Sequence, residues 1–393
     1  MRLPRRTTIA ATAAVALVAT GAAVHAAVPD AFPGWPYGTA GSQPNGVANA
    51  AQAPDAVLAV VGDTACEPDD PQNAGNPAAL KCGSPSLGGM SAAYATVDQI
   101  EAMKPQDVAL LGDEQYQVGK LSDFEQSFDK TYGALKWIIK PAPGNHEYYS
   151  YAKKGDNEAA QDGTGYFSYF NGTNAAGDPR DQGQAGDDTD ANQGWYSYNL
   201  GDWHIISLNA ECGSTVFGGN GVGGTAASCD PTQGLAKAET DWLSYDLSQD
   251  KSRCTIAYWH QPTFSASSSP SPEGGLGDAW WKLLYAHGHA IVLNGHEHYY
   301  ARFAPMDPAG NVDTKNGIPE FIVGSGGEAL DTLDPAATLA SEHVVTGEDT
   351  AYGAMKMTLG QNGKYSWDFE PSYAPPGAPA DAMSYSDKGS ATC

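Results

Sequence analysis

The sequence predicts an α/β fold, specifically a layered α-β-β-α sandwich of two packed mixed sheets with a metal site at the strand ends. Two observations lead to this class. Short apolar, β-branched segments alternate with helical patterns from Pro54 onward, and further strands follow near residue 299. Five apolar segments also end in Asp, Asn, Tyr or His, and functional groups of α/β sheets gather beyond the carboxyl ends of their strands.

The amino-terminal segment, residues 1–26, is expected to be a signal peptide. Arg2, Arg5 and Arg6 precede an apolar, Ala-rich stretch, and Val24-His25-Ala26 offers a cleavage site. A transmembrane anchor is the less favoured alternative because the apolar stretch is short. The paired arginines leave both Sec and twin-arginine export open. We therefore expect a secreted, extracellular protein without stable membrane insertion.

The rest of the chain divides into three segments by composition. Residues 27–53 are rich in Ala, Gly, Pro and Asn without periodicity, which is typical of a linker or arm. Residues 54–372 are long enough for one large domain with a substantial core. Residues 373–393 are rich in Pro, Ala and Ser and are expected to be an extended C-terminal tail.

The charge of the chain limits its partners. The formal net charge is −25 at pH 7, and loss of the three arginines of the signal peptide makes it −28. Such an acidic surface argues against nucleic-acid binding through a basic patch and repels anionic substrates at long range. Chemistry on an anionic substrate therefore needs a local positive centre, which metal ions supply.

The six cysteines predict disulfide bonds rather than a cysteine metal site, because the chain is expected to be exported and has no Cys-x-x-Cys pair. Proximity along the chain favours Cys66–Cys82 and Cys212–Cys229, which leaves Cys254–Cys393. Other connectivities stay open.

The elements are predicted in chain order. Strands are expected at 57–61, 108–111, 137–139, 255–259 and 290–293, helices at 90–103, 121–132, 235–247 and 279–286, and a hairpin at 195–208. Later strands at 299–303, 320–323, 355–359 and 365–369 suggest a second sheet. Residues 149–194 form a long polar stretch that is expected either to overhang the site or to be a surface insertion.

The strand ends carry the candidate metal ligands. They are Asp63, Asp113 with Tyr116, Asn145 beside His146, His260, and His296 with His298. Carboxylates mixed with imidazoles suit Zn, Fe or Mn better than Ca or Mg. A carboxylate such as Asp113 can bridge two cations. His296 and His298 are separated by one residue, so an extended segment would place both on one side.

The ordered motifs resemble the calcineurin-like metallophosphoesterases over about residues 57–305. The motifs are Gly62-Asp63, Gly112-Asp113-x-x-Tyr116, Gly144-Asn145-His146-Glu147, His260 and Gly295-His296-x-His298. Most of that superfamily has Asp-x-His at the first motif, but Ala65 stands here instead of the histidine. Tyr116 occupies the position at which the purple acid phosphatases supply a tyrosinate ligand. The chain is therefore similar to a secreted, bacterial, purple acid phosphatase-like subgroup.

This resemblance implies two metal ions and a hydrolytic reaction. The first ion, typically Fe(III), would be held by Asp63, Tyr116 and His298, and the second, Zn, Fe or Mn, by Asn145, His260 and His296, with Asp113 bridging. The resemblance also implies hydrolysis of phosphate monoesters by a metal-bound hydroxide, with a small-molecule phosphate ester as substrate. His146 would contact the phosphate or act as general acid, and Glu147 would orient a neighbouring residue.

One departure from the subgroup and several alternatives accompany this interpretation. The subgroup usually has another pocket histidine shortly after the position of His260, whereas residues 261–269 contain none. A phosphodiesterase acting on nucleotides or lipid head groups is the enzymatic alternative, with the loops at 149–194 and 213–228 expected to decide specificity. A non-catalytic cell-surface binding module is disfavoured because all seven ligand positions are filled, and a carbohydrate-binding β-protein would not explain the histidines. The sequence leaves the oligomeric state open.

Overall fold

The computed structural model describes residues 55–68, 89–148, 163–175, 182–187, 193–213, 228–267, 275–336 and 343–393. The expected signal peptide over 1–26 and linker over 27–53 lie outside the described residues. So do Cys82, most of the loop at 213–228, and residues 149–162 of the long polar stretch.

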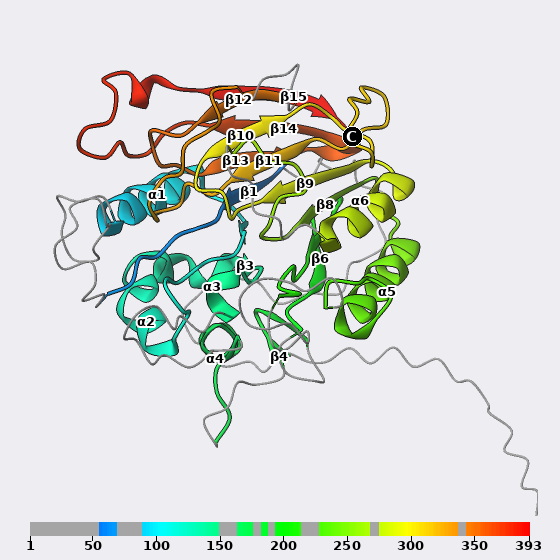
Figure 1. Cartoon of the computed structure of the whole chain (residues 1–393), viewed down its shortest axis with the longest axis horizontal. Helices are drawn as coiled ribbons and strands as arrows, with labels where there is room; N and C mark the ends of the chain where they lie inside the picture. Colours follow the sequence, from blue (N-terminus) through cyan, green and yellow to red (C-terminus); the bar gives the residue numbers. More distant parts are fainter. Residues whose placement is uncertain are drawn as a thin grey trace, which may run out of the picture. The chain divides into compact units, whose positions relative to one another are not determined.

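The first sheet contains six strands in the order β15-β14-β13-β1-β2-β3 (Figure 1). Its parallel part is β1 (Ala56–Val61), β2 (Asp107–Leu110) and β3 (Ile139–Pro141). The antiparallel part is β13 (Met355–Leu359), β14 (Lys364–Phe369) and β15 (Asp387–Thr392), with β13 paired to β1. The sheet is therefore mixed, as predicted.

The second sheet contains seven strands in the order β12-β10-β11-β9-β8-β7-β6. Four strands run parallel: β7 (Trp203–Ser207), β8 (Cys254–Tyr258), β9 (Ala290–Asn294) and β11 (Glu320–Val323). The antiparallel strands are β6 (Tyr196–Leu200), β10 (Tyr300–Phe303) and β12 (Val344–Glu348). A separate two-stranded ribbon joins β4 (Gln182–Gly183) and β5 (Gly186–Asp187).

Helices cover the outer faces of the sheets. The main ones are α1 (Gly89–Met103), α2 (Leu121–Gln126), α4 (Thr164–Asn171), α5 (Gly234–Gln249) and α6 (Gly275–His287). Short helical turns are α3 (Asn145–Tyr148), η2 (Phe128–Lys130), η3 (Tyr132–Ile138), η4 (Gln361–Gly363) and η5 (Ala382–Ser384). In Figure 1, α5 and α6 lie together beside β6 and β8, and α1 and α2 lie on the other side of the view.

The buried side chains form three clusters that correspond to the three interfaces of an α-β-β-α sandwich. Leu58 and Val60 of β1 point into the cluster between the sheets, where they meet Ile256 and other residues of the second sheet. Their neighbours Ala59 and Val61 point into the cluster under α1 and α2. Both faces of β1 are buried, which explains why its sequence is continuously apolar rather than alternating. The predicted fold class is confirmed.

The later strands were expected in the second sheet, which is correct for β10 and β11 but wrong for β13 and β14. Strands β13 and β14 extend the first sheet beyond β1, whereas β10 and β11 extend the second sheet beyond β9. The first sheet thus combines parallel strands from the first half of the chain with antiparallel strands from its end, whereas the antiparallel strands of the second sheet come both before and after its parallel strands. Residues 373–393, expected as an extended tail, end in β15, which pairs with β14 along its whole length.

The helix predicted over 121–132 is also interrupted. It ends at Gln126 because the Phe128 amide donates to the side chain of Gln115 instead of to the preceding helical turn. The Thr131 hydroxyl then donates to the Ser127 carbonyl, which favours a tighter turn. Two short 3₁₀ turns follow, so the next strand begins at Ile139 rather than at Trp137.

Part of the polar stretch at 149–194 is built into the core. Helix α4 buries Tyr166, Phe167 and Phe170, and Phe170 makes edge-to-face contacts with Phe124 and Phe128. The described part of this stretch is therefore anchored by aromatic packing.

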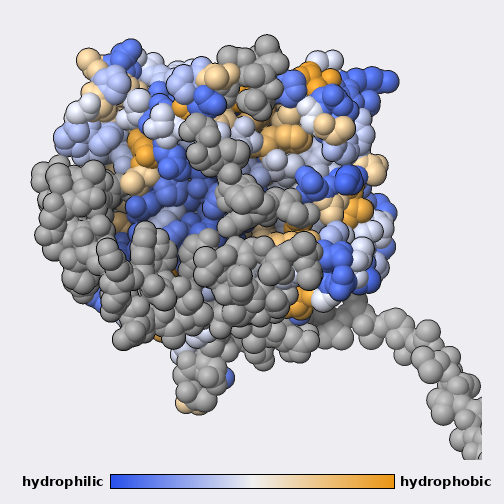
Figure 2. Space-filling view, viewed as in Figure 1, coloured by the Kyte–Doolittle hydropathy of each residue, from blue (hydrophilic) through white to orange (hydrophobic). Residues whose placement is uncertain are grey.

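The two predicted disulfides within the described residues are present, Cys212–Cys229 and Cys254–Cys393. No helix within the described ranges is both long enough and apolar enough to cross a membrane. On the face drawn in Figure 2, hydrophilic residues gather near the centre, in keeping with the high net charge of the chain.

Candidate metal centre

Each predicted site residue follows a strand end, and the two sheets bring these ends together. Strands β1, β2 and β3 deliver Asp63, Asp113 and Asn145 from the first sheet, and β8 and β9 deliver His260 and His296 from the second. The Asp63 amide donates to the Gly112 carbonyl at 3.0 Å, and the Gly295 amide donates to the His260 carbonyl at 3.0 Å. The parallel pairing of the strands therefore continues into the site.

Three of these residues have a left-handed backbone. The φ angles of Asp63, Asp113 and His296 are 60°, 51° and 69°. Non-glycine residues rarely adopt such angles, and they cluster at functional sites where the surrounding structure enforces them. The turns redirect the chain immediately after each strand, so that the side chains reach the same point.

Two glycines allow the close approach of these turns. A Cβ atom on Gly144 would lie 2.2 Å from Asp113 Oδ1, and one on Gly112 would lie 2.5 Å from His260 Nδ1. Neither distance is compatible with a side chain. The glycines of Gly-Asp and Gly-Asn-His are therefore required by the geometry of the site.

One group of donor atoms surrounds the hydroxyl of Tyr116. Tyr116 Oη lies 2.9 Å from Asp63 Oδ1, 3.0 Å from Asp113 Oδ2 and 2.9 Å from His298 Nε2. A phenol has one hydrogen, so it can donate to only one of these three atoms. The other oxygen and nitrogen lone pairs therefore face one another and repel. A cation placed among them would remove this repulsion. The donor set fits a metal ion.

A second group surrounds the side-chain oxygen of Asn145. Asn145 Oδ1 lies 3.1 Å from His260 Nε2 and 3.0 Å from His296 Nδ1, and the two ring nitrogens are 3.2 Å apart. Asp113 Oδ2 is 3.2 Å from His260 Nε2. Asp113, His260 and His296 offer ligand atoms that all lie within 4.8 Å of one another, so these three residues could hold a metal ion.

The side chains of both groups are oriented by bonds on their far sides. His260 Nδ1 lies 2.8 Å from the Leu111 carbonyl and His298 Nδ1 lies 2.6 Å from the Ala329 carbonyl, so each of these nitrogens donates its hydrogen and leaves Nε2 free. Asp63 Oδ2 accepts the His296 amide and Asp113 Oδ1 accepts the His146 amide, both at 2.9 Å. One oxygen of each carboxylate is thus fixed and the other faces the site.

Glu147 supports the turn around Asp113. Its carboxylate accepts the backbone amides of Gly144 at 2.8 Å and of Asp113 and Gln115 at 3.1 Å. Burial and the charge of Asp113 raise the pKa of Glu147 to about 8, although these hydrogen bonds lower it. Burial would also raise the pKa of Asp113, but the neighbouring His260 and His146 hold it well below its usual range.

The open side of the site is lined by histidines. Asp63, Asp113, Tyr116, Asn145 and His260 are buried, whereas His146, His296 and His298 are partly exposed. His146 Nδ1 lies 2.6 Å from the Gln117 carbonyl, which directs Nε2 toward Asp113 Oδ2 at 3.7 Å. Burial lowers the pKa of His146, against the charge of Asp113. The seven candidate ligands and His146 therefore form one network of contacts, in which these three histidines are the partly exposed members.

A sixth strand end near the site was not predicted. Strand β7 is followed by Asn209 and Glu211, both buried, and the Gln261 amide donates to Glu211 at 2.6 Å, beside His260. The side-chain amide nitrogen of Asn209 donates to the Tyr148 hydroxyl at 2.9 Å. The apolar segment of β7, which leads to Asn209, could have indicated this strand end. It was not used because the same residues were assigned to a hairpin.

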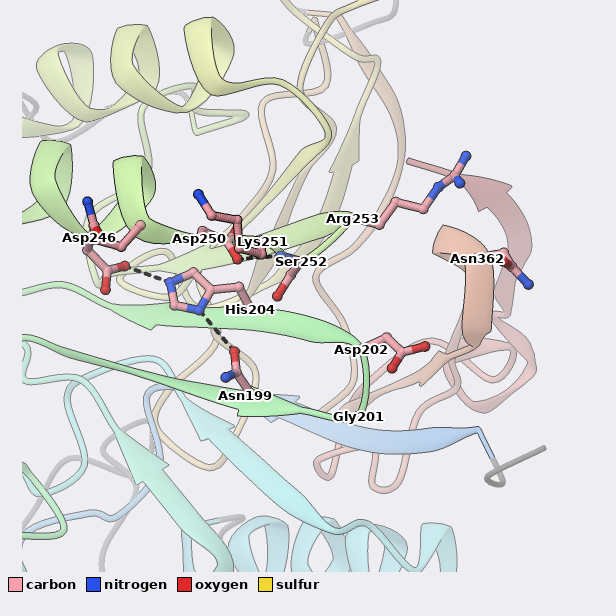
Figure 3. A pocket seen from close by; sticks show the side chains of 11 residues that line it. Asn199, Gly201, Asp202, His204, Asp246, Asp250, Lys251, Ser252, Arg253 and Asn362 are labelled. Carbon is pink, nitrogen blue, oxygen red and sulfur yellow. Dashed lines mark hydrogen bonds and ion pairs between the residues drawn. The ribbon is translucent and has the colours of Figure 1, made fainter. Parts of the chain in front are cut away.

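Another polar pocket, of about 680 Å³, lies at the opposite strand ends, where β7 and β8 begin (Figure 3). His204 stands there between Asn199 and Asp246, at 3.2 Å and 2.6 Å. Asp246 also accepts the Ser197 hydroxyl at 2.8 Å, and Asp250 accepts the Ser252 amide. These side chains form hydrogen bonds with one another, so the pocket has the structural role of linking the β6–β7 hairpin to α5.

The sequence comparisons agree with the site geometry. The family model described as calcineurin-like phosphoesterase matches residues 56–300. Purple acid phosphatase 15 of Arabidopsis thaliana is 25% identical over 193 residues, which cover 46% of this chain and 31% of the plant protein. An uncharacterized protein of Mycobacterium tuberculosis is 24% identical over 246 residues, covering 60% of this chain and 41% of the relative. The chain thus spans less than half the length of these relatives.

Solved structures share the fold. Purple acid phosphatase PPD1 from yellow lupin (Lupinus luteus) seeds aligns with a TM-score of 0.57 at 16% identity, over 87% of this chain and 54% of the lupin chain. The structure of PhoD aligns with a TM-score of 0.54 at 13% identity, over 87% and 73% of the two chains. The predicted resemblance to the superfamily and to its purple acid phosphatase-like subgroup is confirmed, and this chain belongs to the calcineurin-like phosphoesterase family.

Proposed function

We propose that this chain is a secreted, binuclear, metal-dependent phosphatase that hydrolyses small phosphate monoesters. The observation that carries the proposal is the position of Asp113. Its Oδ2 atom lies 3.0 Å from Tyr116 Oη and 3.2 Å from His260 Nε2, between the two groups of donor atoms. A carboxylate shared in this way is what a site for two neighbouring cations requires.

The proposed ligands follow the two groups. Asp63, Tyr116 and His298 hold one ion, which we propose to be Fe(III), and Asn145, His260 and His296 hold the other, Zn, Fe or Mn. Asp113 belongs to both. When bound, the two ions neutralise the phosphate and lower the pKa of a coordinated water.

The histidine-lined side is the proposed route for the substrate. His146 is fixed through its Nδ1 atom and has its Nε2 atom on the partly exposed side of Asp113. In the proposed reaction Nε2 contacts the phosphate or gives a proton to the leaving alcohol. Glu147 holds the Asp113 turn through three backbone amides and so keeps the carboxylate in place.

The experiment is hydrolysis of a chromogenic phosphate monoester beside its bis-ester analogue, by purified protein, across pH and with or without a chelator. Monoester turnover that exceeds diester turnover and disappears on chelation would support the proposal. Faster diester turnover would identify a phosphodiesterase instead. Metal-loaded protein that hydrolyses neither compound would contradict both activities.

A matched pair of variants tests the shared carboxylate. Asp113→Asn is expected to lose both metal content and activity. His204→Ala removes a histidine from the pocket in Figure 3, away from the site, and is expected to keep both. Secretion is tested separately, by determining the amino terminus of the exported protein and comparing it with the expected cleavage after Ala26.

A further inference from the structure

The loop that follows β11 lies against the metal centre but contains none of the proposed ligands. We call residues 324–331 the post-β11 loop; its sequence is Gly-Ser-Gly-Gly-Glu-Ala-Leu-Asp. Strand β11 ends at Val323, whose carbonyl accepts the Gly62 amide at 2.8 Å. The loop therefore begins beside Asp63, a proposed ligand of the first ion.

The first part of the post-β11 loop follows the backbone of the Asp63 turn. The Gly326 amide donates to the Gly62 carbonyl at 3.0 Å, and the Glu328 amide donates to the Asp63 carbonyl at 3.1 Å. Asp63 has a left-handed φ of 60°, which persists in a non-glycine residue only where the surrounding structure enforces it. These two bonds supply part of that constraint.

Two glycines allow the loop to approach this turn so closely. A Cβ atom on Gly326 would lie 2.4 Å from the Gly62 carbonyl oxygen, and one on Gly327 would lie 2.1 Å from the Thr64 carbonyl oxygen. Both neighbours are backbone atoms, which cannot move aside as a flexible side chain could. Any side chain at either position would therefore push the loop and the Asp63 turn apart.

The last part of the loop holds His298, the other terminal ligand proposed for the first ion. The Ala329 carbonyl lies 2.6 Å from His298 Nδ1 and so fixes the ring. Asp331 fixes the backbone, because its Oδ2 atom accepts the His298 amide and its own amide donates to the His298 carbonyl, both at 3.0 Å. Both the ring and the backbone of His298 are thus oriented by one loop.

The second group of ligands is oriented by a different part of the chain. His260 Nδ1 lies 2.8 Å from the carbonyl of Leu111, which follows β2. One bond links the two groups, from the His296 amide to Asp63 Oδ2 at 2.9 Å. The post-β11 loop therefore contacts Asp63 and His298 directly and reaches the second group through Asp63.

We propose that the post-β11 loop is a positioning element that sets the affinity of the first ion separately from that of the second. This inference rests on the two-ion site of the proposed function. Groups that orient metal ligands from behind typically change metal affinity by roughly 10- to 100-fold when they are lost. Asp331 is the residue at which this can be tested with least damage to the fold, because it is exposed.

The test uses Zn²⁺ alone as the probe and measures how many ions the purified protein retains as a competing chelator is added. Asp331→Ala removes the acceptor of the His298 amide. It should release one ion at an about tenfold lower chelator concentration than wild type, while the other ion shifts by less than about threefold. Asp331→Asn keeps an oxygen acceptor and should restore most of the affinity. Gly327→Ala should weaken the same ion.

Each variant has a matched control away from the site. Asp307 is an exposed aspartate in the loop after β10 and accepts the amides of Ala309 and Asn311 at 2.8 Å and 2.9 Å, so Asp307→Ala removes a similar acceptor. Gly317 precedes the amino end of β11, and a Cβ atom there would lie 2.3 Å from the Asp313 carbonyl oxygen. Gly317→Ala therefore introduces a similar clash with the backbone. Both controls should retain two ions as wild type does.

Double variants identify which ion is weakened. Asp331→Ala combined with Asn145→Ala should retain almost no Zn²⁺, because the two changes affect different ions. Asp331→Ala combined with Tyr116→Phe should still retain one ion, because both changes affect the first. The opposite pattern would overturn the proposal.

Amide hydrogen exchange provides a readout that needs neither metal nor turnover. In metal-free protein the His298 amide should exchange at least about tenfold faster in Asp331→Ala than in Asp307→Ala. Equal weakening of both ions would overturn the proposal. Ion retention and exchange that match the control variants would overturn it as well.

The two proposals fail in different ways. Wild-type protein that retains two Zn²⁺ ions but hydrolyses no phosphate ester would refute the proposed function, and the chelator titration would still decide the role of the loop. Active wild-type protein whose Asp331→Ala variant loses both ions together would overturn only the role of the loop. Wild-type protein that binds fewer than two ions would overturn both.

Discussion

Replacing Gly112 with alanine would test how firmly the structure positions His260. The new Cβ atom would lie 2.5 Å from Nδ1, 2.7 Å from Cγ and 2.9 Å from Cβ of the His260 side chain, whereas ordinary contact begins at 3.4 Å. To reach that distance the ring must move by about 1 Å, in a packed environment that yields little. The φ of Gly112 is +91°, which adds about 1 kcal/mol of backbone strain for alanine.

The ring has little freedom to move. His260 is fully buried, its Nδ1 atom is bonded to the Leu111 carbonyl at 2.8 Å, and Nε2 lies within 3.2 Å of Asp113 and Asn145. A displacement of about 1 Å at a reacting centre costs roughly 100-fold in rate, so we expect kcat/KM of Gly112→Ala to fall by about that factor. Metal content measured on the purified variant should fall with it.

Gly234→Ala is the control for this experiment. Its φ is +53°, again left-handed, but no heavy atom lies within 4 Å of the added Cβ. It should therefore lose about 1 kcal/mol of stability and retain activity. If Gly112→Ala retains metal and activity within about threefold of Gly234→Ala, the argument that a close approach fixes His260 is refuted.

Three further predictions concern single residues. If Tyr116 binds Fe(III), the protein absorbs broadly in the visible and Tyr116→Phe abolishes the band; a colourless, iron-replete wild-type protein would contradict the assignment. Burial raises the pKa of Asp387, but hydrogen bonds from Arg302 at 2.7 Å and 2.9 Å and from other neighbours outweigh burial and lower it. The stability that ionised Asp387 contributes is therefore complete above about pH 4 and is lost as pH falls through the lowered pKa of the folded state. Asp387→Asn should cost about 2 kcal/mol of unfolding free energy at pH 7 and should weaken its dependence on acid pH, measured by urea titrations. An unchanged pH dependence would argue against this role of Asp387. His204→Ala should cost about 1–3 kcal/mol through loss of its bond to Asp246 while leaving kcat/KM unchanged, and a loss of activity beyond the loss of folded protein would show that the pocket is coupled to the site.

The central strands could be predicted because both of their faces are buried. Val57 to Val61 and Ala290 to Leu293 are continuously apolar, which only a covered strand requires. Edge strands carry no such signal. Strand β15 reads Asp-Lys-Gly-Ser-Ala-Thr, buries only Asp387 and has no large apolar residue, so composition alone suggested a tail.

The site was predictable to a similar extent and for a related reason. Its ligand types stand directly after the buried strands, so the strand pattern located Asp63, Asp113 and His260. The supporting contacts join residues that are far apart in sequence, as in Ser265 with Glu297 or Gln261 with Glu211. Local patterns contain no information about such pairs, because they depend on how the two sheets are placed against each other.

The division of the ligand positions between the two sheets has a thermodynamic consequence. Asp63, Asp113 and Asn145 belong to one sheet and His260 and His296 to the other, so an ion held by both would act as a cross-link across the inter-sheet core. Any partial unfolding that separates the sheets would then have to release the ion. The melting temperature should rise with free metal concentration as ligand linkage requires. The melting temperature of this chain would thus depend on the concentration of free metal in its surroundings.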